Sequence, residues 1–255
     1  MTWRNKPLMV AVGCAFLGLA VAFVAAPDPQ PTTGCIETRV IGQSVQGNEI
    51  TLCHVGGSQI GSKNSLLVIG SVHGTELAGL SVVDQIIKNG VMESDLWVIR
   101  NANPDGAKAA TRQNANGVDL NRNFPTNWLP SDPTSGTFSG FTPASEPETQ
   151  SLMRIIDELK PRIVITLHQP YGLIDCAFER GPELSMRLSE LTGLPMQCIP
   201  GEWSGSETNK YTGTISIWVN KRYKDSTALA LEIGENPTKQ QLQRYADALV
   251  RLYQK

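Results

Sequence analysis

Apolar runs alternate along the chain with segments in which apolar residues recur every three or four positions. The runs are short and rich in Val, Ile and Leu, which is typical of strands buried on both faces of a parallel sheet. The other segments have the periodicity of amphipathic helices. Strands that alternate with helices predict an α/β domain. The predicted strands span 65–72, 96–100, 163–168 and 227–233, and the predicted helices end near 88 and cover about 145–159, 183–192 and 240–253.

Two other parts of the chain depart from this alternation. Residues 36–42 and 48–55 predict a pair of strands around a turn at 46–48. Residues 101–145 are rich in Asn, Pro, Gly, Ser and Thr and show little periodicity. A long irregular stretch inside a compact domain is usually functional. Ser145 and Glu148 have the spacing of a capping box, which predicts that the next helix begins there.

The N-terminal residues predict an export segment. Arg4 and Lys6 precede an uncharged apolar run over 8–26, and a proline-rich stretch over 27–34 follows. This order is typical of a signal peptide or of a signal anchor with a cytoplasmic N-terminus. The run is almost long enough to span a bilayer, so cleavage and anchoring both stay open. We therefore expect an export segment at 1–26, which tethers the protein to the inner membrane through 8–26 if it is not cleaved.

The rest of the chain is then a linker at 27–34 and one folded domain at 35–255, periplasmic or otherwise exported. The formal net charge of the chain is −2 at pH 7, and it has neither a basic stripe nor a cluster of aromatic residues. These features argue against a nucleic-acid partner.

Four cysteines follow the apolar run: Cys35, Cys53, Cys176 and Cys198. In an oxidising compartment an even number permits two disulfides, and pairing of near neighbours is the simplest arrangement. Buried free thiols are the alternative, and the two interpretations stay open here. No pair of cysteines has the spacing of a zinc site.

Two of the three histidines, His73 and His168, stand at the carboxyl ends of predicted apolar strands. Ligands in open α/β sheets bind at those ends. Glu76 follows His73 by three residues, a spacing that lets both side chains reach one metal ion. Two imidazoles and a carboxylate leave a fourth position for water, which is typical of catalytic zinc. The alternative is a carboxylate that caps a helix and two histidines with ordinary hydrogen-bond partners.

The irregular stretch contains two arginines, Arg112 and Arg122, among several amide side chains. The guanidinium group keeps its charge and binds a carboxylate through two hydrogen bonds. A solvated loop accounts for the turn-forming Asn116–Gly117 pair. It does not account for Arg122 among the apolar residues Val118, Leu120 and Phe124.

Several motifs follow one another along the chain. They are His73-x-x-Glu76, Asn103-Pro104-Asp105-Gly106, Gly117-Val118-Asp119-Leu120-Asn121-Arg122-Asn123-Phe124, Ser145-Glu146-Pro147-Glu148, His168 and a late strand with Glu232. With these motifs in this order, the chain resembles the zinc carboxypeptidases related to carboxypeptidase A. The resemblance covers about 36–250, and the pairing of an Asp-x-Asn-Arg-Asn element with an upstream His-x-x-Glu is its most specific part. Leu167-His168-Gln169-Pro170 and the short length are similar to the bacterial murein peptide amidase branch.

The resemblance implies a mixed, mostly parallel twisted sheet with helices on both faces, and one Zn²⁺ per chain. It implies that His73, Glu76 and His168 are the metal ligands. By the same resemblance, Arg112 binds the substrate and steadies the oxyanion. Asn121 and Arg122 bind the free carboxylate of the substrate, and Glu232 is the general base and acid. Tyr211 aligns loosely with a substrate-binding tyrosine, and its role stays open.

The strand pattern also favours Glu232 as the base. By alternation along 227–233, Glu232 shares a face with Ala228 and Ala230, whose small side chains leave space beside it. Glu235, three residues on, is the competing candidate.

Together these features predict a zinc-dependent peptidase or amidase. The expected reaction is hydrolysis of a peptide or amide bond near a free carboxylate, in peptidoglycan-derived peptides of the γ-D-glutamyl-diaminopimelate type. A general metallocarboxypeptidase and an inactive peptide- or wall-binding protein are the alternatives.

Overall fold

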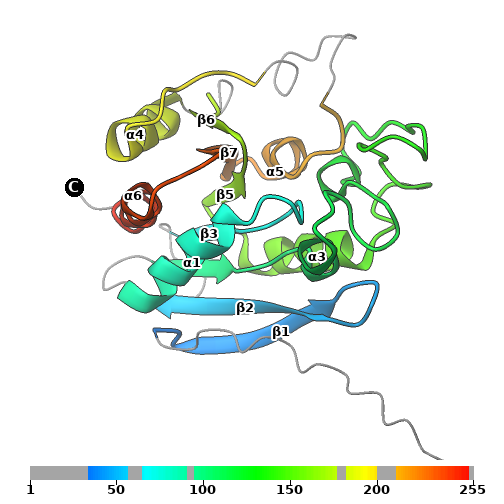
Figure 1. The fold of residues 1–255 in the computed structure, drawn as a ribbon, viewed down its shortest axis with the longest axis horizontal. Helices are drawn as coiled ribbons and strands as arrows, with labels where there is room; N and C mark the ends of the chain where they lie inside the picture. The colour runs from blue at the N-terminus through cyan, green and yellow to red at the C-terminus, as the bar shows by residue number, and fades with distance from the viewer. Residues whose placement is uncertain (1–33, 57–64, 91–94, 177–181, 200–210, 253–255) are drawn as a thin grey trace, which may run out of the picture.

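A mixed seven-stranded sheet forms the centre of the computed structural model, which describes residues 34–56, 65–90, 95–176, 182–199 and 211–252 (Figure 1). Its order is β1-β2-β4-β3-β5-β7-β6. The four central strands are parallel, whereas β1, β2 and β6 pair antiparallel at the edges. The strands are β1 Glu37–Gln43, β2 Glu49–Gly56, β3 Ser65–Ile69, β4 Asp95–Ile99, β5 Ile163–His168, β6 Tyr171–Ile174 and β7 Thr227–Gly234.

Helices cover both faces of this sheet, as expected from the alternating pattern. Helices α1, α4 and α6 pack on one face and α3 and α5 on the other, while α2 and the 3₁₀ turn η1 lie in the segment between β4 and α3. The helices are α1 Ala78–Asn89, α2 Pro104–Ala109, η1 Leu120–Arg122, α3 Pro147–Leu159, α4 Pro182–Thr192, α5 Ile215–Arg222 and α6 Lys239–Val250.

Strand β3 shows why the central strands are apolar throughout. Leu66 and Val68 pack in the core under α1 and α6, and Leu67 and Ile69 pack in the core under α3 and α5. All four side chains are fully buried. Because successive side chains point to opposite faces, a strand covered on both sides needs an apolar residue at every position. Full burial of each such side chain contributes about 1.5–3 kcal/mol.

The observed elements differ from the predicted ones in several places. The strand predicted for 65–72 ends at Ile69, and Ser71 then adopts a positive φ of 47°. Strand β6 was not predicted, because its four residues are too few to show alternation. Helix α5 was not predicted either, since the six residues from Ile215 to Asn220 are all buried and leave no polar stripe to reveal its period.

The predicted capping box at Ser145 is wrong. Helix α3 begins one residue later, with Glu146 as its N-cap and Pro147 in its first turn, and Glu146 makes no side-chain cap hydrogen bond. The carboxylates of Glu146 and Glu148 instead accept hydrogen bonds from the side-chain amide of Asn114, at 2.7 and 3.0 Å. A capping box does form at α6, between Thr238 and Gln241.

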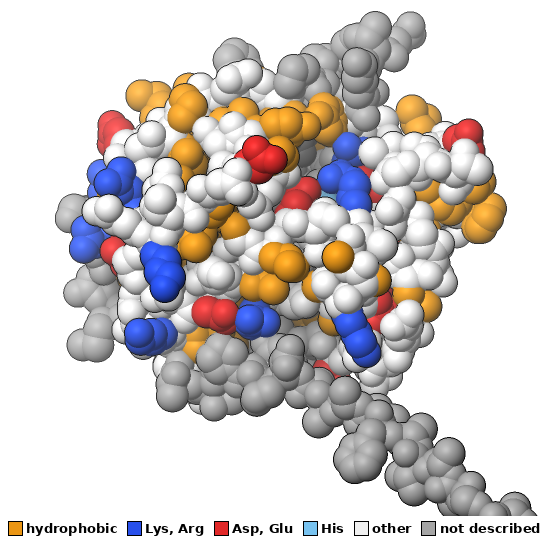
Figure 2. Space-filling view, in the orientation of Figure 1, with side chains coloured by type: hydrophobic (Ala, Val, Ile, Leu, Met, Phe, Trp, Pro, Cys, Tyr) orange, Lys and Arg blue, Asp and Glu red, His pale blue; other side chains and the backbone are white. Residues whose placement is uncertain are grey.

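Two disulfides, Cys35–Cys53 and Cys176–Cys198, confirm the pairing of near neighbours and exclude free thiols at these positions. The predicted export segment and residues 27–33 of the predicted linker lie outside the described residues. Within the part of the chain that the structure describes, no helix has the length and apolar character needed to cross a bilayer. On the face shown in Figure 2, Lys and Arg side chains are scattered among acidic and neutral ones and form no continuous basic stripe.

Candidate active site

His73, Glu76 and His168 converge at the carboxyl ends of β3 and β5. Their side chains are almost completely buried, and one potential ligand atom from each lies within 4.8 Å of the others. The Nδ1 atoms of His73 and His168 each lie 2.8 Å from an oxygen of the Glu76 carboxylate. Because β3 and β5 are neighbouring parallel strands, the residues that follow β3 and those that end β5 meet at the same edge of the sheet.

The loop that carries His73 and Glu76 passes close to α2. A Cβ atom on Gly74 would lie only 2.0 Å from the backbone carbon of Gly106, so only glycine fits this contact. The Gly74 N–H also donates to the carbonyl oxygen of Arg112, at 3.2 Å. These backbone contacts join the His73 loop to the irregular segment between β4 and α3.

Asp119 holds the other side of the His73 ring. Its Oδ1 lies 3.0 Å from His73 Nε2 and accepts the backbone N–H of Asn121 at 2.9 Å. Its Oδ2 accepts from Arg112 Nε at 3.0 Å. Burial disfavours the ionised form of this fully buried carboxyl, but His73 and the two nearby arginines, Arg112 and Arg122, outweigh burial and hold the pKa of Asp119 well below its usual range.

The donor set fits a metal cation. Ionised Glu76 and Asp119 only accept hydrogen bonds, so a neutral His73, which has one N–H, satisfies only one of them. Burial opposes protonation of His73, yet Asp119 and Glu76 raise its pKa above the usual value. A metal cation held by His73 and Glu76 would meet the same requirement as a second proton. Asp119 would then orient the His73 ring, as the carboxylate does in carboxylate–histidine–zinc sites.

Glu232 enters the site from β7. It is the register partner of His168 on the neighbouring strand, which places both side chains on one face of the sheet. Its Oε2 is buried and has no hydrogen-bond partner among the described residues. Burial raises the pKa of Glu232 above its usual value. Ala230 and Glu232 line one pocket, so they share a face of β7, as alternation along the strand predicted.

Three residues of the irregular segment also line the pocket. Arg112 donates to Glu76 Oε1 at 3.2 Å. Asn121 Oδ1 accepts the N–H of Ile215, the first residue of α5, which leaves its side-chain NH₂ group as a donor. Arg122 donates through Nη1 to the Asn121 carbonyl oxygen at 2.7 Å, and its guanidinium carbon lies 4.8 Å from the centroid of the Tyr211 ring.

One cavity of about 350 Å³ is lined by the side chains of His73, Glu76, His168, Glu232, Arg112, Asn121 and Arg122. A family model described as zinc carboxypeptidase matches residues 32–174, which is more than half of the chain. The protein belongs to the zinc carboxypeptidase family.

Named relatives include murein peptide amidases. The chain is 32% identical to murein peptide amidase A of Escherichia coli strain K12 over 150 residues, which cover 53% of this chain and 60% of the relative. It is 27% identical to murein peptide amidase A of Vibrio campbellii over 213 residues, which cover 77% and 80%. The matched region thus spans less than two thirds of the length of the Escherichia coli relative.

Solved structures show the same fold. The crystal structure of murein-tripeptide amidase MpaA from Escherichia coli O157 has a TM-score of 0.70 and 25% identity, and the match covers 88% of this chain and 95% of that one. Carboxypeptidase A of Helicoverpa armigera has a TM-score of 0.68 at 17% identity, with 86% and 68% covered, which is a likeness of fold alone.

In this zinc carboxypeptidase all seven predicted site residues line the cavity, and Tyr211, whose role stayed open, lines it too. Glu235, the competing base, is exposed and lines a neighbouring concavity with Thr75. Asp119 was part of the quoted motif, but no role was predicted for it. Its signal in the sequence is an acid between the apolar residues Val118 and Leu120, which suits a buried and partnered carboxylate.

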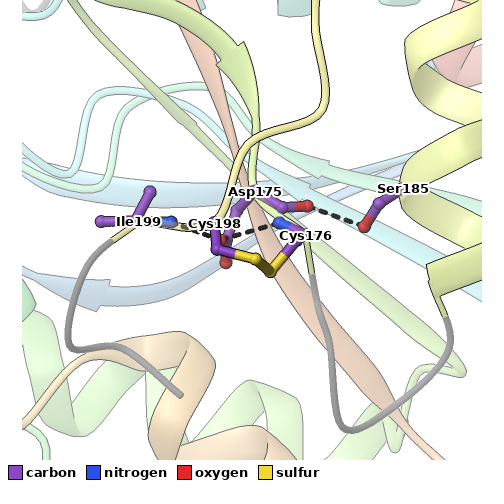
Figure 3. Close-up of a disulfide and its surroundings, with 5 residues drawn as sticks. All are labelled: Asp175, Cys176, Ser185, Cys198 and Ile199. Atoms are coloured by element: carbon purple, nitrogen blue, oxygen red, sulfur yellow. Dashed lines mark hydrogen bonds between the residues drawn. A yellow bond between two sulfur atoms is a disulfide. The ribbon is translucent and has the colours of Figure 1, made fainter. Parts of the chain in front are cut away.

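One wall of the cavity is held by the second disulfide. Ile199 lines the pocket and directly follows Cys198. Its backbone N–H donates to Oδ1 of the buried Asp175, which also accepts from the N–H of Cys176, and Ser185 donates to the Asp175 carbonyl oxygen (Figure 3). The disulfide and these hydrogen bonds tie Ile199 to β6 and α4.

Proposed function

We propose that the protein is a zinc-dependent hydrolase that cleaves an amide bond next to a free carboxylate in peptidoglycan-derived peptides. The observation that carries the proposal is that three metal-type ligands, an arginine and a carboxylate whose Oε2 has no hydrogen-bond partner among the described residues all line one cavity. Membership of the zinc carboxypeptidase family supports the reaction class. The murein peptide amidases among the relatives support the choice of substrate.

In the proposed reaction His73, Glu76 and His168 hold one Zn²⁺ per chain. Bound there, zinc supplies a water of lowered pKa, about 7, and polarises the scissile carbonyl. Glu232 accepts a proton from the attacking water and returns it to the leaving nitrogen. Its position opposite His168, with Oε2 unpartnered among the described residues, suits this exchange.

The irregular segment binds the two charged groups of the reaction. Arg112 donates hydrogen bonds to the oxyanion that develops on the scissile carbonyl. The guanidinium of Arg122 and the side-chain NH₂ of Asn121 bind the free carboxylate of the leaving residue, which places the scissile bond beside Glu232. The ring of Tyr211 packs on Arg122 and limits the directions in which this guanidinium points.

We also propose that the domain works outside the cytoplasm. Two disulfides suit an oxidising compartment. An export segment at 1–26, either cleaved or retained as an inner-membrane anchor, accounts for how a domain over 35–255 reaches the periplasm. Comparison of the N-terminal sequence and membrane fraction of the mature protein distinguishes cleavage from anchoring.

One experiment tests the proposed function. The purified protein is analysed for bound zinc and is then incubated with a γ-D-glutamyl-diaminopimelate muropeptide and with an ordinary peptide, and the products are identified by mass spectrometry. We expect one zinc per chain and release of diaminopimelate from the muropeptide. Removal of C-terminal L-residues from the ordinary peptide alone would indicate a general metallocarboxypeptidase. Binding of muropeptide without cleavage would indicate an inactive binding protein.

A further inference from the structure

The side-chain amide of Gln169 connects the segments that carry two of the predicted metal ligands and the base. Gln169 directly follows His168 at the end of β5. Its Oε1 accepts the backbone N–H of Ala78 at 2.9 Å. Its Nε2 donates to the carbonyl oxygens of Gly234 and Glu235, at 3.2 and 3.3 Å. One side chain therefore bonds the start of α1 and the end of β7 to the end of β5.

Helix α1 uses Gln169 as a cap from another element. Its own N-cap residue is Leu77, which makes no side-chain cap hydrogen bond. The first N–H groups of a helix have no partner within the helix, and Gln169 Oε1 satisfies the N–H of Ala78. Ala78 follows Glu76 by two residues. The bond therefore fixes the point at which the chain leaves the predicted ligand and enters the helix.

The contacts of Gln169 with β7 hold the end of the strand that carries the base, Glu232. Gly234, whose carbonyl oxygen accepts from Gln169, follows Glu232 by two residues. Tyr171, two residues after Gln169, is the antiparallel register partner of the same Gly234. The short segment 169–171 thus holds the Glu232 end of β7 by its backbone and by a side chain.

We propose that Gln169 is a positioning residue that fixes the position of the metal ligand Glu76 relative to the base Glu232. An amide suits this task because it accepts one hydrogen bond and donates two at the same time, which a carboxylate or a hydrocarbon side chain does not do. The assignment of Glu76 and Glu232 rests on the proposed function.

The decisive variant is Gln169→Met, which keeps the length of the side chain and removes the three hydrogen bonds. We expect the zinc affinity and kcat each to fall about 10- to 100-fold, the usual effect of losing a partner of a metal site. KM should change less than about twofold, because Arg122 and Asn121 are untouched. Zinc affinity is measured by competition with a chelator, without substrate, and kcat and KM with the muropeptide.

Gln243→Met is the matched control. Gln243 lies on α6, where its Nε2 donates to Asp247 at 2.9 Å, and it does not line the pocket. We expect this variant to keep the zinc affinity, kcat and KM of the wild type. If Gln169→Met does not fold by circular dichroism, Gln169→Glu, which keeps the Ala78 contact, replaces it in the same measurements.

Unchanged zinc affinity and unchanged kcat in the folded Gln169 variant would overturn the proposal. A rise in KM at constant kcat would also overturn it, because that result assigns Gln169 to substrate binding. A wild-type protein that binds zinc but hydrolyses neither test peptide contradicts the proposed function, whereas the comparison of zinc affinities still decides whether Gln169 positions Glu76.

Discussion

The central sheet and the irregular segment 101–145 both contribute side chains to the pocket, but different forces hold them. The central strands place His168 and Glu232 at the end of two apolar cores, so the position of these residues follows from burial. The irregular segment places Arg112, Asn121 and Arg122 through hydrogen bonds. Asn114 binds the carboxylates of α3 through its amide, and its Oδ1 accepts the N–H groups of Asn116 and Val118.

Because of this difference, substitutions in the two regions should affect different properties, the stability of the fold or the activity. A change in the apolar cores weakens the whole fold, because many side chains share the lost contacts. A change in the polar network of the irregular segment leaves both cores intact and moves a few catalytic side chains. The irregular segment therefore allows activity to be lost without global unfolding, and the following four substitutions test this contrast.

The largest effect is expected for Glu232→Gln, on the sheet side of the pocket. Loss of the general base should lower kcat by about 10²–10⁴-fold. The amide is nearly isosteric, so zinc content and the thermal midpoint should stay close to those of the wild type. The measurements are steady-state kinetics with the muropeptide and metal analysis of the purified variant. Retention of more than half of the wild-type kcat would exclude Glu232 as the base.

Leu67→Ala tests the apolar core. Leu67 is fully buried on β3, and its truncation should cost about 2–5 kcal/mol of unfolding free energy through lost burial and a cavity. Urea denaturation measures the loss, with Leu129→Ala, at a residue that is 58% exposed, as the control. At temperatures well below the thermal midpoint, kcat/KM should stay unchanged. A large fall in kcat/KM of the folded variant would contradict the separation between the two regions.

Arg122→Met tests the carboxylate-binding side of the pocket. Removing the charged donor should cost about 1.5–3 kcal/mol of transition-state stabilisation. This corresponds to a fall of roughly 10- to 150-fold in kcat/KM, mainly through a higher KM. Arg251→Met, at an exposed residue outside the pocket, is the control. The loss should shrink for a substrate whose C-terminal carboxylate is amidated, because this variant no longer distinguishes the two. An equal preference for the free carboxylate in both proteins would argue against the assignment.

Asn114→Ala should lower the unfolding free energy less than Leu67→Ala does. It leaves the buried carboxylates of Glu146 and Glu148 with one donor fewer each, at a cost of about 1–3 kcal/mol. Because Asn114 also holds the loop before Asp119, we expect kcat/KM to fall more than it does in Leu67→Ala. Asn236→Ala, at an exposed position, is the control. Equal activity of Asn114→Ala and wild type would show that the network does not position the loop.

The pattern of residues predicted β3, β4, β5 and β7, because a strand buried on both faces must be apolar at each position, and it predicted helices α1, α3, α4 and α6. It did not predict β6 or α5, since a short edge strand and a helix buried on all sides carry no periodic signal. It assigned Glu148 to a capping box from local spacing, although the carboxylate binds Asn114, which is far away in the sequence.

The sequence by itself determined the alternating α/β layout, because burial selects the residue types along each element. Through the order of its motifs and their resemblance to a known family, it also identified seven of the side chains that line one cavity. Only the tertiary structure decided how those side chains are oriented. Asp119 on His73 and Gln169 between α1 and β7 act through hydrogen bonds between residues distant in the chain. A single polar side chain has several compatible partners, and only the packed fold selects among them.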